Sequence, residues 1–113
     1  MVLRNCSTSV VVASDVVVAS SICARTIGLL ARGAITPDEG MVFLNACAIH
    51  TVGMRASLDV LFLDGENRVV QIRPAVPPNR IVYVRGAAAV VELGAGALER
   101  TDVLVGDRLE LES

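Results

Sequence analysis

The stretch SLDVLFLDGENRVVQIRPAV, residues 57–76, decides the fold. Two apolar runs rich in β-branched residues flank Gly65-Glu66-Asn67, a composition typical of a tight turn between antiparallel strands. The stretch therefore predicts a β-hairpin. Its second strand should end at the cluster Pro74, Pro77 and Pro78, because proline cannot donate to a strand ladder.

Short apolar runs continue on both sides of this hairpin. Before it, VVVAS occurs twice, at 10–14 and 16–20, which predicts two strands joined at Ser14-Asp15, and MVFL (41–44) predicts a buried strand. A helix is expected from Ser20 or Ser21 to about Arg32, with one apolar face. After the hairpin, IVYVRG and AAVVELG predict a further strand pair, GALERTD a short helix or turn, and GDRLELE an alternating strand.

These elements predict a mainly β (α+β) fold. We expect one domain over residues 1–113, a compact barrel-like or sandwiched antiparallel sheet of about seven to eight short strands with one or two short helices. The chain has 53% hydrophobic and 19% charged residues, which excludes disorder. Its length is sufficient for a core without disulfides or metals.

Composition also argues against several functions. A net charge of −2 gives no general attraction to nucleic acid or anionic membranes, and two Phe and one Tyr make no base-stacking platform. No run approaches the ~20 apolar residues of a spanning helix or the length of a signal peptide. Three cysteines without a CxxC pair fit a reducing compartment. We therefore expect a cytoplasmic protein without cofactor, nucleic-acid or membrane partner.

Residues 47–59, CAIHTVGMRASLD, contain the best candidate site. Cys47 and His50 have zinc-like spacing, but a closed site needs two more ligands, so no structural metal is expected. A catalytic thiolate–imidazole pair would require a turn between the two residues. Asp59 interrupts an apolar strand, where a lone charge is costly, and Arg55 lies four residues upstream as an expected ion-pair partner. Alternatively, Asp59 caps nearby backbone amides.

The motifs RTIGLLARG, EGMVFL, CAIHTVGMRASLDVLFLD, RVVQI, VVELGAG and VGDRLEL follow in this order. Their order resembles the DUF192 family, small mainly β domains without an established activity, over residues 16–112. The resemblance places the family pattern on His50, Thr51, Met54, Arg55 and Asp59. The chain departs from that pattern at Ala46, where proline is usual, and at Ala56 and Ser57, where an apolar residue and proline are usual.

The function that fits these observations is a non-catalytic ligand- or partner-binding accessory module. Its cleft would use Cys47, His50, Thr51, Met54, Arg55 and Asp59, with Arg55 anchoring a small anionic ligand or a protein partner. One alternative is an enzyme or metal/thiol site using Cys47, His50 and Asp59. Another is a self-associating structural protein, a homodimer through an edge strand within IVYVRGAAAVV.

Overall fold

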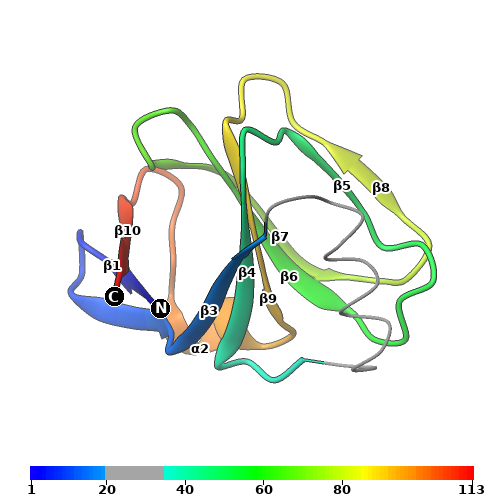
Figure 1. Cartoon of the computed structure of the whole chain (residues 1–113), viewed down its shortest axis with the longest axis horizontal. Helices are drawn as coiled ribbons and strands as arrows, with labels where there is room; N and C mark the ends of the chain where they lie inside the picture. The colour runs from blue at the N-terminus through cyan, green and yellow to red at the C-terminus, as the bar shows by residue number, and fades with distance from the viewer. Residues whose placement is uncertain (20–34) are drawn as a thin grey trace.

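Three antiparallel or mixed sheets make up the domain in the computed structural model, which describes residues 1–19 and 35–113 (Figure 1). The three-stranded sheet has the order β10 (Leu109–Glu112), β1 (Val2–Asn5), β2 (Val10–Ala13). The five-stranded sheet has the order β3 (Asp15–Ala19), β4 (Glu39–Leu44), β9 (Ala89–Gly94), β6 (Leu58–Leu63), β7 (Val69–Val76). The third pairs β5 (Ala48–His50) with β8 (Ile81–Tyr83), and α2 spans Ala97–Thr101.

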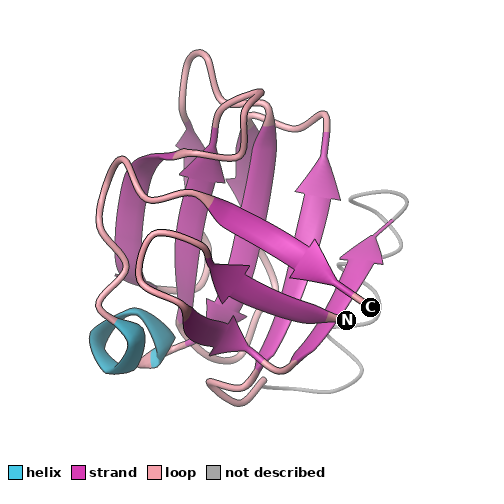
Figure 2. Cartoon of the chain, turned by 90° about the vertical axis from the view of Figure 1, so that its left-hand side faces the viewer, coloured by secondary structure: helices cyan, strands magenta, loops and turns pink. Residues whose placement is uncertain are grey.

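The five-stranded sheet lies between the two smaller ones and has an apolar cluster on each face. On β6, Leu58, Val60 and Phe62 pack toward one cluster, which also holds Ile49 and Val82 of the two-stranded sheet. Its alternate residues Leu61 and Leu63 join a second cluster with residues of β1, β2 and β10. Figure 2 shows the three-stranded sheet covering that second face. All residues of β6 and β9 are buried, as expected for central strands covered on both faces.

The predicted hairpin of residues 57–76 is confirmed, with β6 and β7 antiparallel. Asp64 closes its turn, since its Oδ1 accepts from the backbone N–H groups of Glu66 at 2.8 Å and Arg68 at 3.0 Å. These two bonds lower the pKa of the Asp64 carboxyl. The register of β6 against β7 shifts between Leu58 and Val60, where β7 carries an extra residue and Ala75 has φ 51°.

The mainly β class, the short helix at GALERTD and the alternating last strand are confirmed. The described residues contain ten strands in open sheets, somewhat more than the seven to eight expected. The strands expected at 10–14 and 16–20 both form, but they belong to different sheets. Two expectations about pairing were wrong: β3 pairs with β4 in parallel rather than antiparallel, and β8 pairs with β5 instead of β9.

The apolar pattern did not indicate the parallel pair, but the length of the connection between β3 and β4 did. Parallel neighbours need a crossover of a dozen or more residues, and β3 ends at Ala19 whereas β4 begins at Glu39. The helix expected between Ser20 or Ser21 and Arg32 lies outside the described residues. In the part of the chain that the structure describes, no helix has the length and apolarity to cross a membrane.

The end of β9 is in close contact with the backbone of residues 35–36. A Cβ added to Gly94 would come within 2.2 Å of the carbonyl oxygen of Thr36 and 2.7 Å of that of Ile35. Thr36 is itself fixed, because its carbonyl accepts from the N–H of Glu39 at 3.0 Å. Gly94 therefore permits a close backbone crossing that brings the chain into β4.

Candidate functional site

Among the described residues, the partners of the Asp59 carboxylate are three backbone amides. The residue is 2% exposed on β6, on the sheet face that carries Leu61. Its Oδ1 accepts from the N–H of Ala75 at 2.8 Å, and Oδ2 accepts from Gly96 at 3.1 Å and Leu98 at 2.9 Å. One carboxylate thus fixes the bulge of β7 and satisfies N–H groups at the start of α2, which that short helix cannot pair internally.

The expected ion pair between Arg55 and Asp59 is absent from the described residues. Arg55 is exposed in the turn before β6, and the carboxylate of Asp59 is occupied by its three amide donors. The spacing of four residues brings side chains together on a helix, but these residues lie in a turn and a strand. The capping alternative for Asp59 is the arrangement found, with donors 16, 37 and 39 residues away.

Thr51 joins the turn after β5 to the loop before β8. Its fully buried hydroxyl donates to the carbonyl of Pro77 at 2.7 Å and accepts from the N–H of Arg80 at 2.9 Å. Its backbone N–H donates to the carbonyl of Arg80 at 2.8 Å, and its carbonyl accepts from Asn79 at 2.9 Å. One side chain and its own peptide groups therefore fix the path of residues 77–80.

Asp59 and Thr51 fix the two walls of a surface recess of about 250 Å³. The recess is lined by residues 73–77 from β7 and its bulge and by residues 80–82 leading into β8. Two exposed arginines, Arg73 and Arg80, line it, and neither makes an ion pair with a carboxylate in the described residues. The residues outside that description, 20–34, contain no Asp or Glu. The recess therefore has a positive charge that no acidic side chain neutralises by direct contact.

Both arginines of the recess are oriented by uncharged groups. With the Gln71 amide turned so that its oxygen faces Arg73, that oxygen accepts from Nε at 2.6 Å and Nη2 at 3.2 Å. Nη1 of Arg80 donates to the carbonyls of Pro78 and Asn79, both at 3.4 Å. The sequence-based reasoning missed these two residues. The sequence feature that could have indicated them is the position of these two arginines on either side of Pro74, Pro77 and Pro78.

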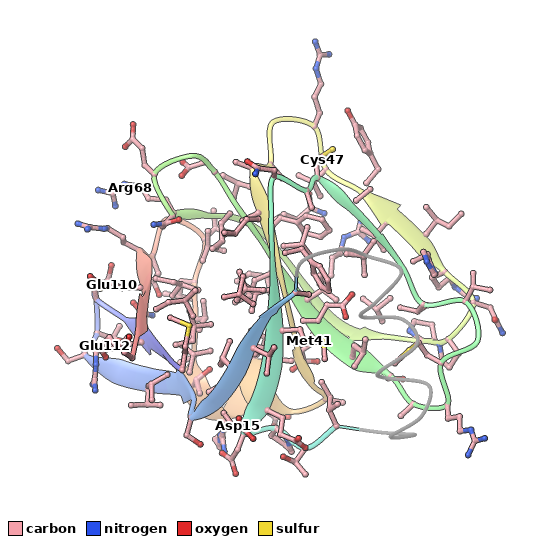
Figure 3. All side chains as sticks on the ribbon, viewed as in Figure 1. Asp15, Met41, Cys47, Arg68, Glu110 and Glu112 are labelled. Atoms are coloured by element: carbon pink, nitrogen blue, oxygen red, sulfur yellow. The ribbon has the colours of Figure 1, made fainter. Side chains whose placement is uncertain are left out.

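The other predicted site residues do not converge on one point. Met54 is buried in the cluster behind β5. His50 is half-buried, and its buried Nδ1 has no hydrogen-bond partner among the residues that the structure describes. Cys47 lies just before β5, at the upper end of that strand (Figure 3). Asp59 is on the opposite sheet face from Met54. Among residues 1–19 and 35–113, no three His, Cys, Asp or Glu side chains are grouped to hold a metal ion.

The thiol of Cys6 has a carboxylate neighbour that the sequence did not reveal. Its Sγ donates to Oε2 of Glu110 at 3.2 Å, and this hydrogen bond is the main reason that the Cys6 pKa is raised. Both groups are exposed on the outer side of the three-stranded sheet. Figure 3 shows Glu110 on that side, next to Glu112. Because the thiolate is the nucleophile, the carboxylate makes Cys6 less reactive.

Replacing Glu110 with glutamine is expected to speed alkylation of Cys6 by iodoacetamide at pH 7.5 roughly two- to fivefold, because the charge that disfavours the thiolate is lost. Peptide mass spectrometry after timed quenching would separate Cys6 from Cys47. The matched control Glu99→Gln changes an exposed glutamate on α2 and should leave the Cys6 rate unchanged. Equal rates in the two variants would contradict the assignment.

The fold and the site define an open, mainly β domain with a cationic recess at the end of its central hairpin. The model of DUF192, described as an uncharacterized ACR, matches residues 3–111. The chain belongs to this family, as its motif order indicated. The match extends the family-like region beyond residues 16–112 to include β1, so both outer sheets are part of the family fold.

Curated relatives carry the name UPF0127 protein. The one from Pyrococcus abyssi is 32% identical over 116 residues, covering 96% of this chain and 96% of that protein. The one from Thermococcus sibiricus is 35% identical over 78 residues, covering 69% of this chain and 49% of the relative. In the Thermococcus sibiricus and Pyrococcus furiosus relatives, the matched region spans about half of the relative's length.

Two crystal structures share the fold. A Sinorhizobium meliloti protein described as a "putative transcription regulator" has a TM-score of 0.78 and 29% identity, covering 96% of this chain and 89% of its own. A protein of unknown function from Novosphingobium aromaticivorans has a TM-score of 0.75 and 24% identity, with 97% and 82% covered. The second likeness concerns the fold alone.

Proposed function

We propose that the chain is a non-catalytic binding module for a small anionic ligand, such as a carboxylate-bearing metabolite, and that the ligand occupies the recess between Arg73 and Arg80. The observation that carries the proposal is the pair of exposed guanidinium groups in one recess without an acidic partner. Arginine binds carboxylates in a planar, two-pronged geometry, and its charge is not lost at any ordinary pH.

The residues of the family pattern support this location through the backbone they fix. Asp59 holds Ala75, whose φ of 51° is unfavourable for a residue with a Cβ, and so maintains the bulge that follows Arg73. Thr51 holds residues 77–80, and His50 pairs with Ile81 across β5 and β8. Compared with the sequence-based prediction, the anchoring role moves from Arg55 to Arg73 and Arg80. Thr51 and Asp59 become positioning residues.

Citrate, succinate and inorganic phosphate serve as probes for the test, by calorimetry and by ¹H–¹⁵N correlation spectra of the full chain. Saturable binding is expected for at least one of them, with shifts at residues 73–77 and 80–82. Arg73→Gln and Arg80→Gln should each weaken that binding about tenfold, since a hydrogen bond to a charged group contributes about 1.5–3 kcal/mol. Added salt should weaken it as well.

Arg85→Gln provides the control, because it removes an exposed arginine in the loop after β8 that does not line the recess. Its affinity should equal that of the parent chain. The proposal fails if no probe binds saturably, if the shifts fall elsewhere, or if both recess variants bind like Arg85→Gln. Spectra of each variant without ligand would confirm that the fold is retained.

Other functions have less support. The regulator description belongs to the Sinorhizobium meliloti protein, and the net charge of −2 here argues against strong DNA binding. An enzyme using Cys47, His50 and Asp59 would need Asp59 to release its three amide donors. Free thiols at Cys6 and Cys47 fit the expected cytoplasmic location. Homodimerisation stays a prediction, and within IVYVRGAAAVV only β8 lies at a sheet edge, because β9 is central.

A further inference from the structure

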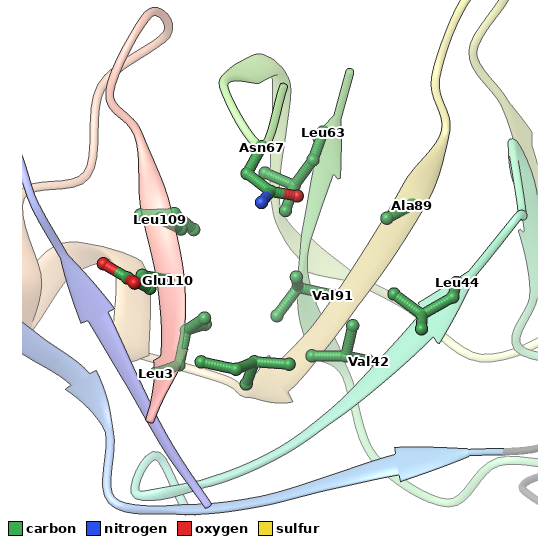
Figure 4. Close-up of a pocket in the computed structure, with 10 residues that line it drawn as sticks. Leu3, Val42, Leu44, Leu63, Asn67, Ala89, Val91, Leu109 and Glu110 are labelled. Atoms are coloured by element: carbon green, nitrogen blue, oxygen red, sulfur yellow. The ribbon is translucent and has the colours of Figure 1, made fainter. Parts of the chain in front are cut away.

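A second cavity, of about 260 Å³, lies between the three-stranded and the five-stranded sheets (Figure 4). It shares no lining residue with the arginine recess. Leucines of β1 and β10 form one wall, and aliphatic residues of β4, β6 and β9 form the other: Leu3, Leu109, Val42, Leu63 and Val91. Each of these five side chains is at most 4% exposed, so the interior is apolar.

Asn67 supplies the polar group of this cavity. Figure 4 shows its side-chain amide directed into the cavity, and the described residues offer that amide no hydrogen-bond partner. Its backbone is fixed between two elements, because its N–H donates to the Asp64 carbonyl at 3.1 Å and its carbonyl accepts from Leu109 at 2.9 Å. These bonds fix the backbone at the cavity mouth, where the exposed side-chain amide offers both a donor and an acceptor.

Glu110 lines the cavity only through its aliphatic part. Its carboxylate points away from the cavity in Figure 4 and accepts from the thiol of Cys6 at 3.2 Å. The remaining lining residues carry no charged side chain. A charged ligand would consequently lose its hydration without finding a counter-charge, which is costly in an apolar site.

We propose that this cavity binds a small uncharged molecule with an apolar body and one polar group that hydrogen-bonds to Asn67. The cavity of about 260 Å³ is larger than the ~150 Å³ that admits benzene and slightly smaller than the ~300 Å³ at which typical ligand pockets begin. Its size therefore suits a molecule with one ring. A single aromatic or aliphatic ring with a hydroxyl or carbonyl group meets both requirements. The site is independent of the anion recess, so either can fail without the other.

The test titrates the full chain with phenol, toluene, benzoate and benzylammonium, followed by ¹H–¹⁵N correlation spectra. Phenol and toluene should give saturable shifts at residues such as Val42, Leu63 and Val91, with phenol binding more tightly, and the two ions should give none there. Asn67 has φ 64°, which glycine adopts without strain, so Asn67→Gly removes the amide and keeps the backbone. It should weaken phenol binding about fivefold and leave toluene unchanged.

Ala89→Leu places three more carbon atoms into the cavity, because Ala89 lines it and is 5% exposed. It should abolish binding of both neutral probes, whereas the same change at exposed Ala95, outside the cavity, should not. If overpacking by Ala89→Leu unfolds the chain, the comparison of phenol and toluene binding by Asn67→Gly still tests the proposal. The proposal is overturned if neither neutral probe binds, if their shifts cluster away from the cavity, or if Asn67→Gly affects toluene as much as phenol.

Discussion

Replacing Asp59 with asparagine is expected to lower the free energy of unfolding by about 2–4 kcal/mol. The side-chain amide keeps one acceptor oxygen and brings two N–H donors to a place where three backbone N–H groups already point inward. In one orientation it orphans the N–H of Ala75, and in the other those of Gly96 and Leu98. Each buried donor left without a partner costs about 1–3 kcal/mol.

Urea unfolding followed by far-ultraviolet circular dichroism measures this loss, because the chain has no tryptophan to serve as a probe. Asp102→Asn is the matched control: the same change at an exposed residue with φ 52°, a conformation that asparagine tolerates. It should be nearly neutral. Arg55→Met should also be nearly neutral and additive with Asp59→Asn, and strong coupling between these two changes would contradict the absence of an ion pair.

Gly94→Ala is expected to destabilise the fold by about 3 kcal/mol or more. The new methyl group would sit 2.2 Å from a backbone oxygen, so relief requires the segment at Thr36 or the end of β9 to move. Because Gly94 pairs with Leu58, such a movement would also disturb the ladder beside Asp59.

Gly65→Ala provides the comparison, since no atom lies within 4 Å of the added Cβ in the exposed turn of the hairpin. That change should be neutral or slightly stabilising, because alanine restricts the unfolded chain. The same urea denaturation series serves both glycines. Similar midpoints for the two variants would show that the crossing at Thr36 is more open than the structure indicates.

Local patterns predicted the strands well because each pattern depends only on neighbouring residues. The hairpin around Gly65, the buried run before Asp64 and the alternation of Leu109 and Leu111 all follow from side-chain period and turn composition. The sheet to which each strand belongs was harder to predict from the sequence, because it depends on pairing between strands that are far apart in the chain. Thus IVYVRG and AAVVELG are adjacent in sequence, but β8 joins β5 while β9 lies between β4 and β6.

The candidate site shows the same difference between local features, which the sequence indicates, and long-range contacts, which it does not. The sequence singled out Asp59 because a carboxylate within an apolar strand must have partners, and that reasoning was sound. It named Arg55 because arginine was nearby in the chain, whereas the partners are amides of Ala75, Gly96 and Leu98. Backbone donors have no sequence signature. The recess at Arg73 and Arg80 depends on a bulge at Ala75. Because the residue with positive φ there is alanine rather than glycine or asparagine, the sequence did not indicate the bulge.

The pairing of β1 with β10 has a consequence for the order of folding. Val2 pairs with Glu112 and Asn5 with Leu109, so the three-stranded sheet is complete only after β10 has joined β1. Contacts of such long sequence separation slow folding, because the chain loses loop entropy before they form. During synthesis the β1–β2 and β6–β7 hairpins can assemble early, because their strands are neighbours in the sequence. The part of the apolar face that β10 covers stays open to water until β10 has left the ribosome.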